Sequence, residues 1–152
     1  MHTRRQVLSN SAKLASLLAA TGLFPALSHA AFNAAAFEAK TMADLSKSLG
    51  MAAPVESKDV TLTAPDIAEN GAVVPVGAAT NLPGVKRLLL LVEKNPAMLV
   101  ALFDVTDAVE ANVSTRVKMG QSSNVYAVAV MNDGKVLYSV KEVKVTLGGC
   151  GG

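Results

Sequence analysis

Apolar and polar residues alternate without interruption from Val109 to Met119. The two sets are Val109, Ala111, Val113, Thr115, Val117 and Met119 on one side, and Glu110, Asn112, Ser114, Arg116 and Lys118 on the other. Neighbouring side chains of a strand point to opposite faces of a sheet. The alternation therefore predicts a strand with one buried and one exposed face.

Two further segments, Leu88–Val92 and Val125–Met131, are apolar on both parities. Short continuous apolar runs are typical of strands that are buried on both faces. For Val125–Met131 two interpretations remain open. We favour a strand inside the domain, and the alternative is a strand with one face at a subunit interface.

The last predicted strand changes the side on which its apolar residues fall. Val136, Tyr138 and Val140 share one parity, whereas Val143, Val145 and Leu147 share the other. Strict alternation through Lys141 and Glu142 would turn one of these sets to solvent. We therefore expect a bulge or bend at Lys141 and Glu142, where the strand would also give way to the tail.

Helical periodicity precedes the strands. Asn33–Gly50 predicts a single helix, with Asn33 as its N-terminal cap and Gly50 in the left-handed conformation at its end. Phe37, Met42, Leu45 and Leu49 fall on one face at 100° per residue. We expect this face to pack on the domain.

Turn signals separate the strands, among them Asn70-Gly71, Asn95-Pro96 and Asp133-Gly134. Several short strands at such spacing favour an all-β fold. We predict an immunoglobulin-like antiparallel β-sandwich of about seven strands, with one N-terminal helix and a flexible C-terminal arm. A small barrel is the alternative architecture.

Residues 1–30 have the features of a cleaved export signal. Arg4 and Arg5 form a twin-arginine motif, an apolar stretch follows up to Leu27, and Ser28-His29-Ala30 supplies small residues for a signal peptidase. The apolar stretch is shorter than the ~20 residues that a membrane span needs. We expect export of the folded protein to the periplasm, although Val7 stands where the twin-arginine consensus usually has Phe.

Removal of residues 1–30 changes the charge and the chemistry. The chain has 14 basic and 12 acidic residues, and three basic residues (Arg4, Arg5 and Lys13) leave with the signal, so the net charge becomes −1. No basic patch then indicates nucleic acid or a membrane as a partner. Both histidines leave as well, which argues against catalytic triads, the usual zinc sites and haem ligation. We expect no cofactor, no metal and no catalytic residue.

One candidate for chemistry remains, because Cys150 is the only cysteine and has two glycines on each side. Gly148, Gly149, Gly151 and Gly152 leave the backbone unrestricted and narrow, as suits a flexible arm that enters a channel. The thiolate is strongly nucleophilic toward oxidised sulfur. No neighbouring group obviously activates this thiol. We therefore predict that Cys150 is a covalent attachment point and that a partner protein supplies its activation.

The tail and three internal segments resemble the SoxY family of sulfur carriers of the bacterial sulfur-oxidising (Sox) system. The Gly-Gly-Cys-Gly-Gly sequence at 148–152 is the hallmark of that family. The segments 64–76, 93–96 and 115–123 are similar to it as well. Together with the twin-arginine signal, the resemblance covers essentially the whole chain.

The resemblance implies a non-catalytic carrier with an immunoglobulin-like fold. Its partner would be a small β-sandwich protein of the SoxZ type, in a heterodimer. A c-type cytochrome complex would conjugate Cys150 to thiosulfate, a hydrolase would release sulfate, and other Sox enzymes would act on the remaining sulfur. On this basis the chain comprises a signal (1–30), a carrier domain (31–147) and a carrier arm (148–152).

The tail allows two other interpretations. An exported structural β-sandwich protein could use Cys150 only for an intermolecular disulfide. A ubiquitin-like sulfur carrier would instead use the carboxylate of Gly152, but those proteins need ATP and a shorter body. The ubiquitin-like carrier differs from the carrier hypothesis in the atom that is modified, and the structural protein differs in that loss of the thiol would leave sulfur metabolism untouched.

Overall fold

The computed structural model describes Arg4, Gln6, Asn10 and residues 33–146. The chain divides into two compact units, residues 1–32 and residues 33–152. Arg4, Gln6 and Asn10 are helical. Residues 33–146 contain the other described helices and all the described strands. Within the described residues, no helix has the length and apolar character needed to cross a membrane.

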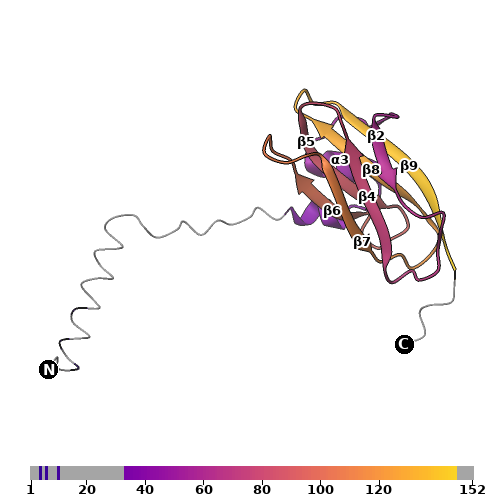
Figure 1. The fold of residues 1–152 in the computed structure, drawn as a ribbon, viewed down its shortest axis with the longest axis horizontal. Coiled ribbons are helices and arrows are strands. Elements are labelled where there is room, and N and C mark those ends of the chain that lie inside the picture. The colour runs from indigo at the N-terminus through magenta and orange to yellow at the C-terminus, as the bar shows by residue number, and fades with distance from the viewer. Residues whose placement is uncertain (1–3, 5, 7–9, 11–32, 147–152) are drawn as a thin grey trace. The chain divides into compact units, whose positions relative to one another are not determined.

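The domain is a sandwich of two sheets, as predicted for an immunoglobulin-like fold (Figure 1). The larger sheet has the order β1-β9-β8-β5-β6, and its strands are β1 (Val55–Glu56), β5 (Val85–Val92), β6 (Leu99–Asp104), β8 (Ser123–Met131) and β9 (Val136–Val145). The smaller sheet has the order β2-β4-β7, with β2 (Val60–Thr63), β4 (Val74–Thr80) and β7 (Asn112–Val117). A two-residue strand, β3 (Ile67–Ala68), pairs with β9 outside this order. The described part thus has nine strands against the expected seven, because β1 and β3 are too short to be recognised from a pattern.

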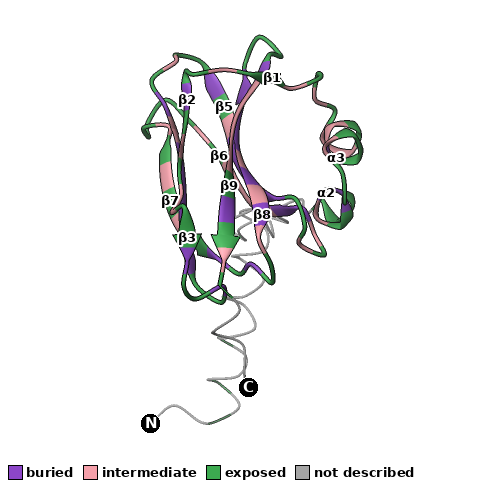
Figure 2. Ribbon diagram, turned by 90° about the vertical axis from the view of Figure 1, so that its right-hand side faces the viewer, coloured by how far each residue is buried: buried purple, intermediate pink, exposed green. Residues whose placement is uncertain are grey.

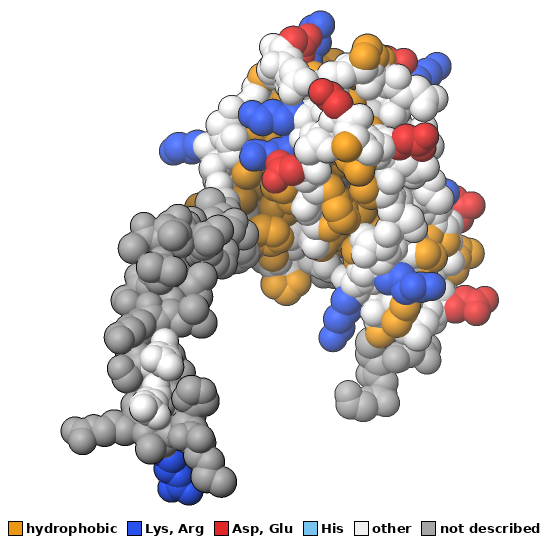
Figure 3. Space-filling view, turned by 60° about the vertical axis from the view of Figure 1, so that its left-hand side comes forward, with side chains coloured by type: hydrophobic (Ala, Val, Ile, Leu, Met, Phe, Trp, Pro, Cys, Tyr) orange, Lys and Arg blue, Asp and Glu red, His pale blue; other side chains and the backbone are white. Residues whose placement is uncertain are grey.

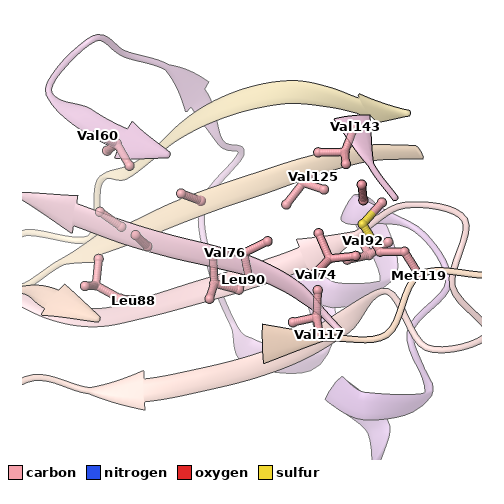
Figure 4. Packing of buried hydrophobic residues seen from close by; sticks show 14 of the residues in the cluster. Val60, Val74, Val76, Leu88, Leu90, Val92, Val117, Met119, Val125 and Val143 are labelled. Carbon is pink, nitrogen blue, oxygen red and sulfur yellow. The ribbon is translucent and has the colours of Figure 1, made fainter. Parts of the chain in front are cut away.

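Two hydrophobic clusters lie on the two faces of the larger sheet. The first fills the space between the sheets and includes Val74, Leu90 and Val143, as Figure 4 shows. The second lies between the larger sheet and two short helices and includes Leu45, Leu89 and Val128. Figure 2 shows the resulting three layers, smaller sheet, larger sheet and helices.

The middle strands of the larger sheet are therefore buried on both faces, as their apolar runs predicted. In β5, Leu88 and Leu90 belong to the cluster between the sheets, whereas Leu89 and Leu91 belong to the cluster under the helices. In β8 the residues alternate in the same way between the two clusters. Val125–Met131 is thus an interior strand, and the helices supply the second covering layer.

The predicted single helix over 33–50 is wrong in one respect, because two helices occupy this segment: α2 (Ala34–Glu38) and α3 (Met42–Leu49). Asn33 caps α2, and Gly50 ends α3 in the left-handed conformation with φ of 62°, both as expected. Between them Ala39 is extended, and its carbonyl accepts a hydrogen bond from the Met98 amide. Thr41 then caps α3 by accepting from the Asp44 amide. The predicted helix is therefore interrupted at two points: Met98, in the loop before β6, bonds Ala39, and Thr41 begins a new helix as its cap.

The predicted strand over 109–119 is shorter than its alternation indicates. β7 begins only at Asn112, which pairs with Ala79 next to the end of β4. Val109 lies in a turn and is 57% exposed. Alternation marks the residues that could form a strand, but a ladder needs a partner, and β4 ends at Thr80.

The bulge expected at Lys141 and Glu142 does not exist, because β8 and β9 pair in continuous register from Ser123↔Val143 to Val130↔Val136. The apolar residues of β9 change face for another reason. Val136 belongs to the cluster under the helices, whereas Val143 belongs to the cluster between the sheets. One continuously paired strand therefore contributes to the two cores in succession.

One edge of the larger sheet is open. β6 is its edge strand, and Val100, Ala101, Leu102 and Phe103 are only partly buried. The strand's charged residue, Asp104, bonds Arg87 at 2.6 Å at the strand end. Figure 3 turns this side of Figure 1 forward and shows hydrophobic side chains gathered on it below charged ones.

Candidate attachment site at the end of β9

The predicted site residues Cys150, Gly148, Gly149, Gly151 and Gly152 lie outside the described residues. The structure instead defines the place from which they continue, because its description ends at Thr146, directly after β9. The candidate site is therefore defined by the groups that are hydrogen-bonded to this end of β9.

On one side, β8 and the loop before it hold the strand. The β8–β9 ladder extends to the pair Ser123↔Val143. Two residues beyond Val143, the Val145 amide donates a hydrogen bond to Ser122 Oγ at 2.9 Å. The hydroxyl thus takes the place of a backbone acceptor where β8 has no further residue to offer.

On the other side, a segment that we call the collar, residues 66–73, holds the same end. The Lys144 amide donates to the Asp66 carbonyl at 3.0 Å, and the Thr146 amide donates to the Ala68 carbonyl at 3.1 Å. These bonds make β3 and β9 a short parallel pair, and Figure 2 shows the two strands side by side. The end of β9 is therefore hydrogen-bonded on both edges, as far as Val145 on the side of β8 and as far as Thr146 on the side of the collar.

A lysine anchors the start of the collar. Lys141 Nζ lies 2.9 Å from Asp66 Oδ1 and donates to the Ala64 carbonyl at 2.8 Å. Lys141 has the parity of Val143, so its stem lies on the face turned to the core between the sheets. Lys141, which interrupts the apolar pattern of the last strand, is thus the residue that connects β9 to the start of the collar.

A glycine lets the collar close against the sandwich. A Cβ at Gly71 would lie 2.4 Å from the Met119 carbonyl oxygen and 2.8 Å from Val145 Cγ1, distances that no real side chain tolerates. The Gly71 carbonyl also accepts from the Met119 amide at 2.7 Å. The Asn70-Gly71 turn signal therefore marks a close approach of two backbones as well as a turn.

The tether of the predicted attachment residue is consequently short. Cys150 is the fourth residue after Thr146. At ~3.5 Å per residue, the two Cα atoms lie at most about 14 Å apart. A strand that gave way at Lys141 would have allowed about 30 Å. The continuous pairing of β9 through Val145 argues for the shorter reach.

The three internal segments that carry the family resemblance meet at this end of the domain. Segment 64–76 contains the collar, and segment 115–123 supplies Met119 and Ser122. Segment 93–96 is bonded to segment 115–123, since Asn95 Nδ2 donates to the Lys118 carbonyl and the Lys94 amide donates to Ser123 Oγ. The sequence alone gave no sign that these distant segments adjoin one another.

A small polar group lies on the neighbouring part of β8. Glu93 Oε2 accepts from Asn124 Nδ2 at 2.8 Å and from the Tyr126 hydroxyl at 3.4 Å. Burial, and after it the negative charge of Glu93, raises the pKa of Tyr126 above its ordinary value of 10.0. Tyr126 therefore remains a neutral donor at physiological pH.

Comparison with known proteins places these features in a family. The family described as "Sulfur oxidation protein SoxY" matches residues 45–150, a range that includes Cys150. The solved structure of the sulfur carrier protein SoxY from Chlorobium limicola f. thiosulfatophilum is 37% identical, with a TM-score of 0.61, and the match covers 68% of this chain and 93% of that one.

A second solved structure, the superoxide reductase (neelaredoxin) from Ignicoccus hospitalis, is 17% identical with a TM-score of 0.52. The match covers 57% of this chain and 80% of that one, and at this identity the likeness concerns the fold alone. A comparison with curated protein sequences gives no match.

Proposed function

Because the chain belongs to the SoxY family of sulfur oxidation proteins, we propose that it is a covalent carrier of thiosulfate-derived sulfur and that Cys150 is the attachment residue. The observation that carries this proposal is the family match, which runs to residue 150 and so includes the thiol and the two glycines before it. The chain contributes attachment and delivery, and partner enzymes contribute the catalysis.

Attachment of thiosulfate to a thiol is an oxidation. The Cys150 sulfur and the outer sulfur of thiosulfate form an S–S bond, the thiol proton is released, and two electrons pass to an acceptor. A c-type cytochrome complex is the acceptor that the family resemblance implies. The product is a cysteine S-thiosulfonate that carries one negative charge.

Release of sulfate from this adduct is a hydrolysis. Water attacks the sulfonate sulfur, the bond between that sulfur and its neighbour breaks, sulfate and one proton leave, and the other proton of the water stays on the outer sulfur of the carrier. The carrier retains a persulfide on Cys150, which further Sox enzymes oxidise or transfer. A persulfide is reactive toward other thiols and disulfides, so delivery on a narrow glycine arm directly into a channel limits side reactions.

The N-terminal segment and the family support a proposal for the cellular setting. We propose export by the twin-arginine route to the periplasm as a folded heterodimer with a SoxZ-type protein. The twin-arginine motif at Arg4 and Arg5 supports the route. Export in the folded state would let a partner without its own signal leave with this chain.

A thiol-free variant tests the proposal. Cys150→Ser should abolish thiosulfate-dependent electron transfer to the cytochrome complex in a reconstituted system, because serine cannot form the S–S bond. Its far-UV circular dichroism should be unchanged, since the strands of the two sheets lie between Val55 and Val145. Turnover by Cys150→Ser would refute the carrier function.

Intact mass spectrometry separates the carrier from the alternatives. After incubation with thiosulfate and the cytochrome complex, the carrier function predicts a reductant-labile adduct at Cys150. A tail cysteine that only cross-links predicts a covalent dimer and no adduct, and a ubiquitin-like carrier predicts a thiocarboxylate at Gly152. Either result would overturn the proposal.

A further inference from the structure

A five-residue pattern at the start of β7 has no part in the proposed carrier chemistry. Glu110-Ala111-Asn112-Val113-Ser114 contains Asn-x-Ser without proline, the acceptor pattern for attachment of a sugar chain to asparagine in exported proteins. Glu110 stands two residues before Asn112 and completes the longer pattern Asp/Glu-x-Asn-x-Ser/Thr, the form that bacterial oligosaccharide transferases accept. So short a pattern also arises by chance, and its use depends on the structure around Asn112.

The Asn112 side chain is free, unlike those of most asparagines in residues 33–146. The side chains with hydrogen bonds inside the domain are those of Asn33, Asn70, Asn95 and Asn124. Within the described residues, the side chains of Asn81, Asn112 and Asn132 have no such bond. Of these three, Asn112 alone has a serine or threonine two residues later, and the hydroxyl of this Ser114 is free as well.

The strand presents the two acceptor groups together at the surface. Asn112 and Ser114 are exposed and share one parity of β7, whereas Val113 between them packs against the core between the sheets. Both acceptor side chains therefore lie on the outer face of the smaller sheet, away from the helices (Figure 2). Their partners across the ladder are Ala79 and Gly77, whose side chains are too small to cover them. A surface hollow of about 330 Å³ beside them leaves room for a first sugar.

The position in the sheet lets the segment open locally. A transferase has to bind the acceptor segment in its own active site, and export by the proposed route delivers the domain already folded. β7 is an edge strand, Asn112 is its first residue, and Glu110 precedes the strand. Release of the segment requires only the opening of the first three pairs with β4 and of the bond from the Thr80 amide to the Ala111 carbonyl. Strand ends open at a small fraction of the global free energy of unfolding.

Asn112 also lies at the end of β7 that is farther from the collar. The strand extends from Asn112 to Val117, about 17 Å at the usual rise per residue. Two residues beyond Val117, the Met119 amide is bonded to the Gly71 carbonyl of the collar. A sugar chain on Asn112 would therefore leave the end of β9 accessible.

We propose that Asn112 is a site of N-linked glycosylation whose donor is an oligosaccharide on a lipid diphosphate. This inference rests on the proposed export and is independent of the chemistry at Cys150. The side-chain nitrogen of Asn112 forms a bond to the anomeric carbon of the first sugar and loses one proton. The bond from that carbon to the phosphate oxygen breaks, and its electron pair leaves with the lipid diphosphate. The Ser114 hydroxyl and the Glu110 carboxylate are the groups by which the transferase selects this asparagine.

Mass spectrometry of the full chain, purified from whole cells of its own organism and treated with reductant, tests the proposal. The mature protein should exceed the mass of residues 31–152 by one oligosaccharide, and fragmentation of the tryptic peptide 95–116 should place the sugar on Asn112. Asn112→Gln, Ser114→Ala and Glu110→Gln should each lower the glycosylated fraction at least about tenfold, whereas Ser114→Thr, which keeps the hydroxyl, should retain it. All three positions are exposed, so these variants should fold.

The matched control is Asn81→Gln. Asn81 is another exposed asparagine with a free side chain, but Pro83 stands where the pattern needs a hydroxyl. Its glycosylated fraction should equal that of the unaltered protein. A sugar chain that persists in Asn112→Gln, or is lost in Asn81→Gln, would overturn the assignment.

The possible failures are distinguishable. A chain without residues 1–30 that has only the polypeptide mass would overturn the glycosylation alone, and a sugar-free chain that retains them would refute the proposed export as well. A sugar that survives Asn112→Gln and disappears in Ser114→Ala would be attached to the serine oxygen, which would also overturn the inference. Turnover by Cys150→Ser would refute the carrier function and leave this inference unaffected.

Discussion

Gly71 is the residue at which a single added atom should have the largest effect on the candidate site. Its φ is not in the left-handed region, so a substitution meets an obstacle of space and not of backbone conformation. Gly71→Ala should lower the free energy of unfolding by about 1–3 kcal/mol, because the Met119 carbonyl must move. Urea denaturation followed by circular dichroism measures this change.

Gly120 provides the matched control, because a Cβ there meets nothing within 4 Å. Gly120→Ala should change the free energy of unfolding by less than about 0.5 kcal/mol, or raise it slightly by restricting the unfolded chain. Equal losses in the two variants would contradict the close approach described for the collar.

Tyr126 gives a spectroscopic test of the polar group beside β8. Burial, and then Glu93, raises its pKa, so the folded state favours the neutral phenol. The resulting stability is complete below the ordinary value of 10.0 and is lost as the pH rises through the folded pKa. In a Tyr138→Phe background, which leaves Tyr126 as the only tyrosine, Glu93→Gln should lower this pKa toward 10.0 without reaching it, because burial persists.

Ultraviolet titration of the phenolate measures the shift. Glu142→Gln is the control, because this exposed carboxylate on β9 is not among the groups that perturb Tyr126. The assignment of the second cause to Glu93 would be wrong if both variants shifted the titration equally.

At the scale of elements, the end of β9 depends on the link between Lys141 and the collar. Lys141→Met keeps the apolar stem and leaves the Ala64 carbonyl without its donor, so the free energy of unfolding should fall by about 1–3 kcal/mol. The amides of Lys144 and Thr146 should exchange with deuterium faster, because they bond the collar. Hydrogen-exchange mass spectrometry of the last peptide measures this effect.

Asp66→Asn separates the two interactions of Lys141. The Asp66 side chain is 88% exposed, and exposed ion pairs contribute less than about 1 kcal/mol. Asp66→Asn should therefore have a clearly smaller effect than Lys141→Met. If the two variants lost equal stability, the ion pair and not the bond to Ala64 would hold the collar.

The apolar pattern predicted the positions of the strands correctly in most places. It did not predict which other elements, the helices or the second sheet, cover each face of a strand. Continuous apolar residues in Leu88–Val92 correctly indicated burial on both faces, because such a run needs two cores. The change of parity in β9 was detected but was explained wrongly by a bulge. A pattern records which residues avoid water, whereas the position at which the helix layer ends and the sandwich core takes over is set by tertiary packing.

At the scale of the whole molecule, the sequence predicted the sandwich and the family but not the surroundings of the tail. The proposal of Cys150 as the attachment residue rests on composition and motif alone, because Cys150 is the only cysteine and lies among glycines, and it stays a prediction. The collar depends on contacts between segments that are far apart in sequence, such as Lys141 with Ala64. Long-range pairs of this kind leave no periodic signal in a single sequence.

The firm hold on β9 has a consequence for the rate of the whole process. In the proposed carrier function, a tether of about 14 Å lets one docked carrier present its sulfur to one active centre only, so each further reaction must wait until the previous complex dissociates. At an association rate constant of about 10⁶ M⁻¹s⁻¹, a cycle that completes about ten visits per second requires dissociation constants of about 10 μM or weaker. The carrier therefore behaves as a diffusing cosubstrate, and tighter docking would slow sulfur oxidation.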